Sequence, residues 1–251
     1  MTENEQRELS AKVVERRMRV ANWHRRLFDD EIVDEKNGWR RAAELGRLGY
    51  GLIVVANHPS LLDGVKAGML VAGDEVRSRK PILFPVAWHQ YYLARMTNWL
   101  LGTRAELKRV VTPHAAQKSS GLARRQGEGL RKYLKASPRV LEEGGTVLLF
   151  RPSEREPRVG KVKKDDIMVE GLLRYLSRTG VETFAVTFVG ISIPTQESER
   201  SRGANLGHKY RLGIGPTLTR EEMALEMTKR GLNADALAVD YLRSLVTADY
   251  Q

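Results

Sequence analysis

Short apolar runs alternate with amphipathic segments along most of the chain. The run Leu52–Ala56 is apolar, rich in β-branched residues and too short for a free-standing helix, which predicts a buried strand. Ser60 then caps a helix whose apolar positions recur at helical spacing as far as Gly73. We expect further strands at 81–86, 108–112, 146–150, 183–189 (continued or capped by 191–194) and 210–214, and further helices at 88–101, 123–135, 167–178, 219–231 and from 233 onward. This alternation predicts an α/β fold with a largely parallel central sheet covered by helices on both faces.

Residues 1–45 differ from the rest because they are highly charged and helical in pattern. Their apolar face consists of Val13, Val20, Trp23 and Leu27, with Val14, Ala21 and Phe28 at its flank. We expect a small N-terminal helical segment with a solvated basic face, broken near Asn37-Gly38 and packed on a main domain that spans 46–251. The alternative is a helix that lies on a membrane surface. Arg16 and Arg17 encroach on the apolar stripe, and this weakens the membrane interpretation.

Size and composition narrow the classes of protein. With 251 residues and 41% apolar residues the chain suits one large α/β domain with a small appendage. The absence of cysteine excludes disulfides, thiolate metal sites and thiol nucleophiles. No apolar run approaches the roughly 18 residues that a membrane-spanning helix needs, and no signal peptide is visible. We therefore expect a cytoplasmic protein, with peripheral contact at the inner face of the membrane as an extension of that expectation.

The net charge of +11 and the pI near 9.9 predict an anionic partner. Nucleic acid, an acidic membrane surface, a phosphorylated substrate and an acidic carrier protein all fit, and charge by itself does not choose among them.

Candidate chemistry begins where the first buried run ends. His58 follows that strand, and Asp63 lies in the first turn of the helix after it. An imidazole titrates near neutrality, so it can accept a proton from a substrate hydroxyl without a metal, and a carboxylate on its other nitrogen fixes the tautomer. A capping aspartate beside a surface histidine has the same spacing; the strand-turn-helix context and Asn57-His58-Pro59 favour the catalytic interpretation.

Two other predicted strands also end in polar residues. His114 follows the strand at 108–112, and a loop with arginines and a serine follows the strand at 146–150. The loop residues of interest are Arg151, Ser153, Arg155 and Arg158. An arginine fork donates two parallel hydrogen bonds to phosphate oxygens, so the loop predicts a phosphate pocket, against the alternative of an exposed Pro- and Arg-rich loop. If the three strands are neighbours, their ends converge on one edge of the sheet.

The segment Asn57-His58-Pro59-Ser60-Leu61-Leu62-Asp63 resembles the Asn-His-x-x-x-x-Asp signature of the glycerolipid acyltransferase superfamily. The resemblance covers about residues 46–250 and is nearer to the soluble, plastid-type glycerol-3-phosphate acyltransferases than to integral-membrane members. It implies a helical N-terminal part, an α/β catalytic domain, and acyl transfer from acyl-CoA or acyl-carrier protein to glycerol 3-phosphate. Lysophosphatidate is the alternative acceptor.

The family pattern carries over residue by residue, with departures. Its second motif is a Lys-His pair, of which His114 carries over and the lysine does not. Its third block, Ala-Pro-Ser-Gly-Gly-Arg-Asp-Arg-Pro, matches at Arg155 directly and at Arg158 with a spacing that differs by one residue. The form Phe-Pro-Glu-Gly-Thr-Arg is absent, although Glu154 and Arg155 can take similar parts, and residues 188–194 resemble the fourth block. The substrate-binding residues that follow from the resemblance and the pattern are Asn57, His114, Arg151, Ser153, Glu154, Arg155 and Arg158.

The expected mechanism is direct acyl transfer. His58, oriented by Asp63, deprotonates the acceptor hydroxyl, which attacks the acyl thioester, while Arg155 and its neighbours hold the phosphate of the glycerol acceptor. No metal or cofactor is expected, because acyl-CoA or acyl-carrier protein is the co-substrate. A basic nucleic-acid-binding protein is the alternative from another class, but no nucleic-acid motif is recognised and the aromatic residues are not interleaved with the basic ones. A catalytically silent lipid-surface protein is a third alternative.

Overall fold

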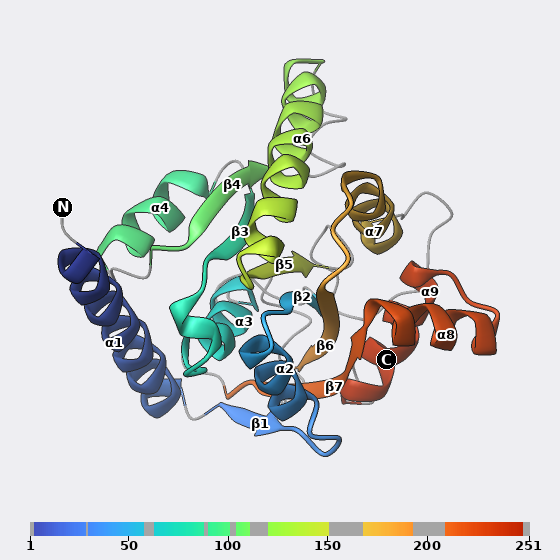
Figure 1. Cartoon of the computed structure of the whole chain (residues 1–251), viewed down its shortest axis with the longest axis horizontal. Helices are drawn as coiled ribbons and strands as arrows, with labels where there is room; N and C mark the ends of the chain where they lie inside the picture. The colour runs from blue at the N-terminus through green and yellow to red at the C-terminus, as the bar shows by residue number, and fades with distance from the viewer. Residues whose placement is uncertain are drawn as a thin grey trace.

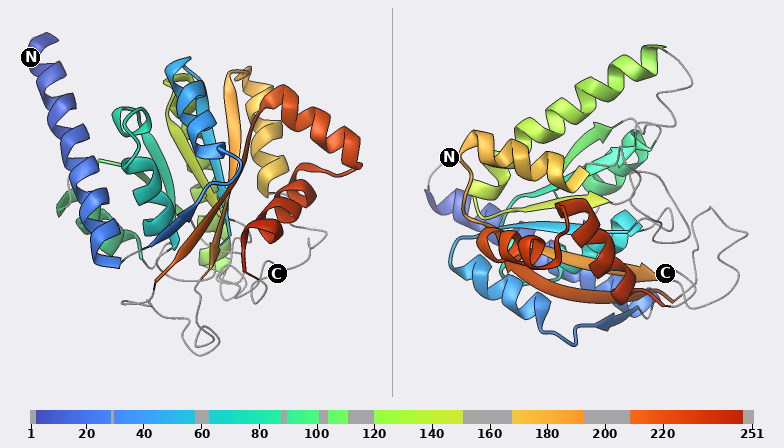
Figure 2. Two further views of the ribbon diagram at one scale, coloured as in Figure 1. Left: turned by 90° about the horizontal axis from the view of Figure 1, so that it is seen from below. Right: turned by 90° about the vertical axis from the view of Figure 1, so that its right-hand side faces the viewer.

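The computed structural model describes residues 3–28, 30–57, 63–87, 90–100, 104–110, 120–150, 168–192 and 209–247. Within these ranges seven strands form one sheet, and helices cover both of its faces (Figures 1 and 2). The strands are β1 (Glu31–Val33), β2 (Gly51–Ala56), β3 (Ile82–Ala87), β4 (Glu106–Val110), β5 (Thr146–Phe150), β6 (Phe184–Ser192) and β7 (Arg211–Thr219). The helices are α1 (Glu3–Phe28), α2 (Gly38–Arg47), α3 (Asp63–Ala72), α4 (Tyr91–Leu100), α6 (Ser120–Glu142), α7 (Met168–Thr179), α8 (Arg220–Arg230) and α9 (Ala234–Leu245), with a 3₁₀ turn, η1 (Arg77–Arg79).

The sheet is largely parallel, and this confirms the predicted fold class. Its strand order is β1-β7-β6-β2-β5-β3-β4. Strands β2 to β6 all run in one direction, β7 pairs with β6 in the antiparallel sense, and β1 pairs with β7 in the parallel sense. Strand β2 is buried along its whole length between β5 and β6, which explains its continuous apolar run.

Alternating side chains assign the helices to the two faces of the sheet. Gly51 of β2 faces α6, where an added Cβ would lie 2.7 Å from the Leu141 carbonyl oxygen. The rings of Phe84 in β3 and Phe150 in β5 lie on the opposite face, against the glycines at positions 64 and 68 of α3. Helices α6, α7 and α9 therefore cover one face, while α2 and α3 cover the other and α1 packs against α3 (Figure 2).

The N-terminal helix α1 forms as predicted, and it buries the flank of the predicted apolar face, where Ala21 is fully buried, while part of the face itself stays exposed. Trp23 and Leu27 of the predicted apolar stripe are each 57% exposed, whereas Arg17 and His24 are buried. The Arg17 guanidinium donates to the carbonyl oxygens of Ser78 (2.6 Å) and Lys80 (2.9 Å). Because backbone acceptors of the turn after α3 need donors, a charged residue is drawn inward and the apolar residues are left outside. No helix in the described ranges is both long enough and apolar enough to cross a bilayer.

Two other sequence predictions, one in the first 50 residues and one near the C-terminus, were incomplete. The region predicted to be helical up to residue 45 also contains β1, a three-residue strand whose pairing partner lies near residue 211. The expected strand 210–214 is longer and runs through Gly215-Pro216 to Thr219. A register shift opposite Phe188 lets the sheet absorb Pro216, and β1 pairs only with the first residues of β7, so the missing N–H of the proline interrupts no ladder on that side.

The caps predicted near the C-terminus are confirmed. Thr219 Oγ1 accepts a hydrogen bond from the Glu222 N–H, and Glu222 Oε2 accepts one from the Thr219 N–H, which completes the capping box of α8. The Asn233 side chain accepts from the Ala236 N–H at the start of α9. Helix α6 is longer at both ends than the predicted 123–135 and includes Pro138. The proposed division of the chain at residue 45 stays a prediction.

Candidate active site

The strand ends that precede the predicted catalytic segments lie side by side. Ala56, the last residue of β2, pairs with Phe150, the last residue of β5, in parallel register. The chain therefore leaves both strands at the same edge of the sheet, one strand spacing apart. Val189 of β6 is the partner of Ala56 on the other side. The carboxyl edge of β2, β5 and β6 is the place where open α/β sheets bind ligands.

The end of the third predicted strand is further away. β4 ends at Val110 at this same edge, but β5 and β3 lie between it and β2. With strands about 4.8 Å apart, the ends of β2 and β4 are about 14 Å from each other. The expected convergence on one edge thus holds closely for β2 and β5, and β4 reaches that edge at a distance.

Asn57 is the site residue whose side chain is described. It is buried (3% exposed), its Nδ2 donates to the Ile191 carbonyl oxygen (2.8 Å), and its Oδ1 accepts from the Ile191 N–H (2.5 Å). The carboxamide thus continues the pairing of β2 with β6 by one residue. This anchoring accounts for an asparagine at the end of β2, and its contact with substrate stays a prediction.

Asp63 was predicted to lie in the first turn of the helix after β2, and α3 includes it as its first described residue, at the carboxyl edge of the sheet. The side chain of Asp63 is not described. The other predicted site residues lie outside the described residues: His58, Ser60, His114, Arg151, Ser153, Glu154, Arg155 and Arg158.

A buried cluster at the same edge was missed by the sequence predictions. Lys66 of α3 pairs with Asp30, and Phe28, Tyr210 and His24 surround the pair. Lys66 was the available signal, because it is the single charged residue between Gly64 and Gly73 in an otherwise apolar helix. Its partners could not be found in this way, since they lie 36 and more residues away along the chain.

The electrostatics of this cluster keep His24 neutral at pH 7. Burial of the imidazole, together with the positive charges of Lys66 and Arg25, lowers the pKa of His24 to about 4. Asp30 Oδ2 lies 3.7 Å from His24 Nδ1, which by itself would favour the charged form. That carboxylate is already paired with Lys66 at 2.7 Å, so burial and the two cations prevail.

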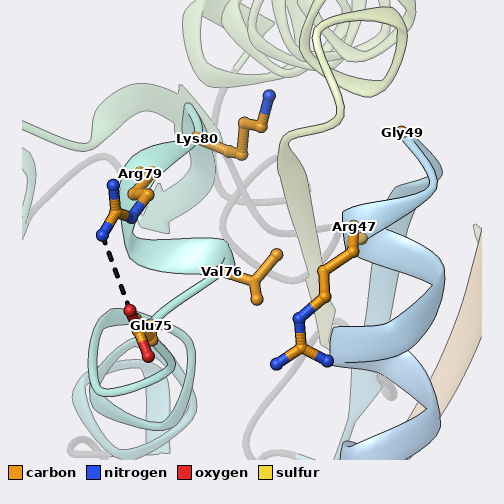
Figure 3. A pocket seen from close by; sticks show the side chains of 7 residues that line it. Arg47, Gly49, Glu75, Val76, Arg79 and Lys80 are labelled. Carbon is orange, nitrogen blue, oxygen red and sulfur yellow. Dashed lines mark ion pairs between the residues drawn. The ribbon is translucent and has the colours of Figure 1, made fainter.

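A pocket of about 330 Å³ lies at the opposite edge of the sheet, between the end of α2 and η1 (Figure 3). It is lined by Gly46, Arg47, Gly49, Glu75, Val76, Arg79 and Lys80. The cationic side chains do not converge: Arg79 turns to Glu75 at 3.6 Å, while Arg47 and Lys80 point in other directions (Figure 3). The pocket precedes β2 and is therefore separated from the carboxyl edge of the sheet by the length of that strand.

Arg77, next to this pocket, holds the amino edge together. It is fully buried, and its guanidinium donates to the carbonyl oxygens of Ala42 (2.5 Å) and Tyr50 (2.8 Å). Burial lowers its pKa to about 10, against the opposing effect of the Asp74 carboxylate. The residue fixes backbone carbonyls and has no open side toward a ligand.

In the described part of the chain, no three His, Cys, Asp or Glu side chains are grouped to hold a metal ion.

No protein-family model matches the sequence, and no curated protein matches it. Among solved structures the chain is similar to the crystal structure of the 1-acyl-sn-glycerophosphate (LPA) acyltransferase PlsC from Thermotoga maritima. The sequence identity is 18%, the alignment covers 92% of this chain and 83% of that chain, and the TM-score is 0.44.

Proposed function

We propose that this protein is an acyltransferase that moves a fatty acyl group from acyl-CoA or acyl-carrier protein to the hydroxyl of glycerol 3-phosphate, with lysophosphatidate as the alternative acceptor. The observation that carries the proposal is the pairing of Ala56 with Phe150. His58 follows one of these strands by two residues and Arg151 follows the other directly. A base and a phosphate-binding loop that start from adjacent strand ends suit one small phosphorylated alcohol.

The proposed reaction needs only one base. His58 takes the proton of the acceptor hydroxyl, and the oxygen attacks the thioester carbonyl, so that a C–O bond forms while the C–S bond breaks. The proton then passes from the imidazolium to the departing thiolate. Asp63, at the start of α3, stabilises the imidazolium.

The acceptor phosphate is assigned to the arginine loop. Arg155, with Arg151 or Arg158, would bind phosphate oxygens through bidentate hydrogen bonds and so hold the hydroxyl near His58. The strand spacing favours this loop over His114 as the main phosphate ligand, because β5 neighbours β2 and β4 does not.

We also propose peripheral contact with an anionic membrane through the outer face of α1. Trp23 and Leu27 are each 57% exposed there, and Arg16, Arg19 and Arg26 are exposed on the same helix. Arg17 points inward and therefore does not interrupt this apolar stripe, whereas Arg16 stays on the exposed side of the helix. Large apolar residues flanked by arginines suit the interface of a bilayer rich in anionic lipid. Co-sedimentation with phosphatidylglycerol vesicles should be lost in W23A/L27A and in vesicles of phosphatidylcholine alone.

The experiment that tests the enzymatic proposal is thiol release from palmitoyl-CoA and from palmitoyl-acyl-carrier protein, with glycerol 3-phosphate or lysophosphatidate offered in turn. We expect release that depends on the acceptor and is absent from H58A. Thiol release that no acceptor stimulates would contradict the proposal. The alternative, a nucleic-acid-binding protein, is tested by measuring the affinity for non-specific DNA at increasing salt concentration. That alternative requires measurable DNA binding whose affinity falls steeply as the salt concentration rises.

A further inference from the structure

Lys66 is an unusual residue for its position, because its side chain has no exposed surface. Its Nζ lies 2.8 and 2.7 Å from the two carboxylate oxygens of Asp30, whose side chain is 5% exposed. Lysine is almost never fully buried unless it is paired, because the removal of an ammonium from water is strongly unfavourable. The ion pair of Lys66 and Asp30 is therefore part of the protein interior and not a surface contact.

Two aromatic rings complete the surroundings of the ammonium. Its Nζ lies 4.1 Å from the centroid of Phe28 and 4.4 Å from the centroid of Tyr210. Both distances are within the range of cation–π attraction. The Tyr210 N–H also donates to Asp30 Oδ1 (3.2 Å), so the same carboxylate binds α3 and the segment that leads into β7. The end of α1, the start of α3 and the start of β7 thus meet at one charged pair.

The pair lies at the carboxyl edge of β2. Arg211, the first residue of β7, is the partner of Ser192, the last residue of β6, and Asn57 joins β6 at Ile191. Lys66 is one helical turn after Asp63, within the helix that Asp63 begins. Whatever direction the pair imposes on the first turn of α3 is therefore imposed on the backbone of Asp63.

We propose that Lys66 and Asp30 are positioning residues that hold the first turn of α3 against the sheet edge and so set Asp63 relative to the end of β2. The inference rests on the proposed function of His58 and Asp63. A buried ion pair stabilises a fold no better than apolar residues of the same volume. Unlike apolar packing, the ion pair fixes the position of the Lys66 side chain, because both carboxylate oxygens and two ring faces constrain its ammonium group.

The test compares the parent with the double variant D30N/K66M. Neither single variant is suitable, because each removes one charge of the pair and leaves the opposite charge buried. The double variant removes both charges at nearly constant volume, and the carboxamide that replaces the Asp30 carboxylate keeps an oxygen for the Tyr210 N–H. R230M/D240N is the control, since it removes a partly exposed ion pair with a separation of 2.5 Å between α8 and α9, together with the contacts of Arg230 with Glu226 and Tyr241, far from the carboxyl edge of β2 in the sequence.

We expect D30N/K66M to keep the urea midpoint of the parent and its KM for the thioester, while kcat falls about 10- to 100-fold, as a displacement near 1 Å would cause. The control should keep the parental kcat. Amide hydrogen exchange in the peptide that covers α3 should accelerate about tenfold in the double variant, with exchange in β5 unchanged. A purely structural pair would change the urea midpoint and leave kcat per folded molecule unaltered.

The two proposals fail in different ways. If the parent releases no thiol with any donor and acceptor, the proposed function fails, and hydrogen exchange still decides whether the pair holds α3. If the parent is active and D30N/K66M has parental kcat and parental exchange in α3, the positioning role is overturned.

Discussion

Asn57 and Ile191 are joined by a pair of hydrogen bonds in which the side-chain carboxamide of Asn57 binds both the N–H and the C=O of Ile191. The two residues lie 134 positions apart in the sequence, at the ends of adjacent strands. This link fixes the backbone at the end of β2, directly before residue 58. Asn57 therefore helps to position the predicted base, His58.

The first prediction concerns that link. Asn57→Ala leaves a buried N–H and a buried C=O of Ile191 without partners and should lower the free energy of unfolding by about 2 to 4 kcal/mol. Urea denaturation measures the change. Asn98→Ala is the matched control, because Asn98 makes the same pair of bonds to Ala105 at a part-buried site, and its loss should cost about 1 kcal/mol. Equal costs at the two sites would show that burial at β2 is not what makes the link important.

Two glycines of α6, two positions apart, should respond in opposite ways to alanine. An added Cβ at Gly127 meets no atom within 4 Å, so Gly127→Ala should stabilise the protein by about 0.5 to 1 kcal/mol through helix propensity. An added Cβ at Gly129 would overlap with the Arg109 carbonyl oxygen of β4, and Gly129→Ala should destabilise by about 1 to 3 kcal/mol. Thermal unfolding of both variants tests the packing of α6 on β4, and a gain in stability for both would contradict it.

His24 should make the protein less stable in mild acid. Its pKa is about 4 in the folded protein against 6.5 for the free side chain, so the unfolded chain binds more protons between these values. Neutral His24 therefore contributes to the free energy of unfolding in full above pH 6.5, and this contribution is lost as the pH falls toward 4. The loss in the free energy of unfolding is at most about 3 kcal/mol. When the urea midpoint is measured at pH 7, 5.5 and 4.5, it should fall less steeply with decreasing pH in His24→Gln than in the parent. The same slope in both proteins would assign acid sensitivity to other groups.

The proposed base pair predicts a specific kinetic pattern. His58→Ala should lower kcat by about 10²- to 10⁴-fold, the usual contribution of general-base catalysis, with an unchanged circular dichroism spectrum. Asp63→Asn should also lower kcat, since it removes the charge that stabilises the imidazolium. Acceptor-dependent turnover at the parental rate in either variant would remove that residue from the mechanism.

Arg155 should affect the acceptor more than the donor. Loss of a charged hydrogen bond to phosphate costs about 1.5 to 3 kcal/mol, so Arg155→Ala should raise the KM for glycerol 3-phosphate about 10- to 100-fold while the KM for the thioester changes little. Arg178→Ala, an exposed residue at the end of α7, removes the same charge elsewhere and serves as the control. An unchanged KM for every phosphorylated acceptor would show that Arg155 is not part of the phosphate site.

Several features could be predicted because their causes are local. The apolar run of β2 identifies a buried strand without knowledge of its neighbours, and the Thr219–Glu222 capping box closes within three residues. The missing cysteine excludes thiol chemistry outright. The helix after β2 was also predicted from the sequence, and Asp63 lies in its first turn as expected, while the catalytic role of His58 and Asp63 stays a prediction.

The features that the sequence did not predict depend on contacts between residues that are distant in sequence. Arg17 is buried because Ser78 and Lys80 present carbonyls to it, and Lys66 is buried because Asp30 and two rings enclose it. The antiparallel direction of β7 and the placing of β5 beside β2 depend on which strand edges are free when the chain closes. The periodicity of apolar residues indicates whether a side chain faces inward, but it does not indicate which group that side chain contacts. For that reason the sequence predicts a base after β2 and a phosphate-binding loop after β5, whereas the buried contacts of Arg17 and Lys66 are known only from the folded structure.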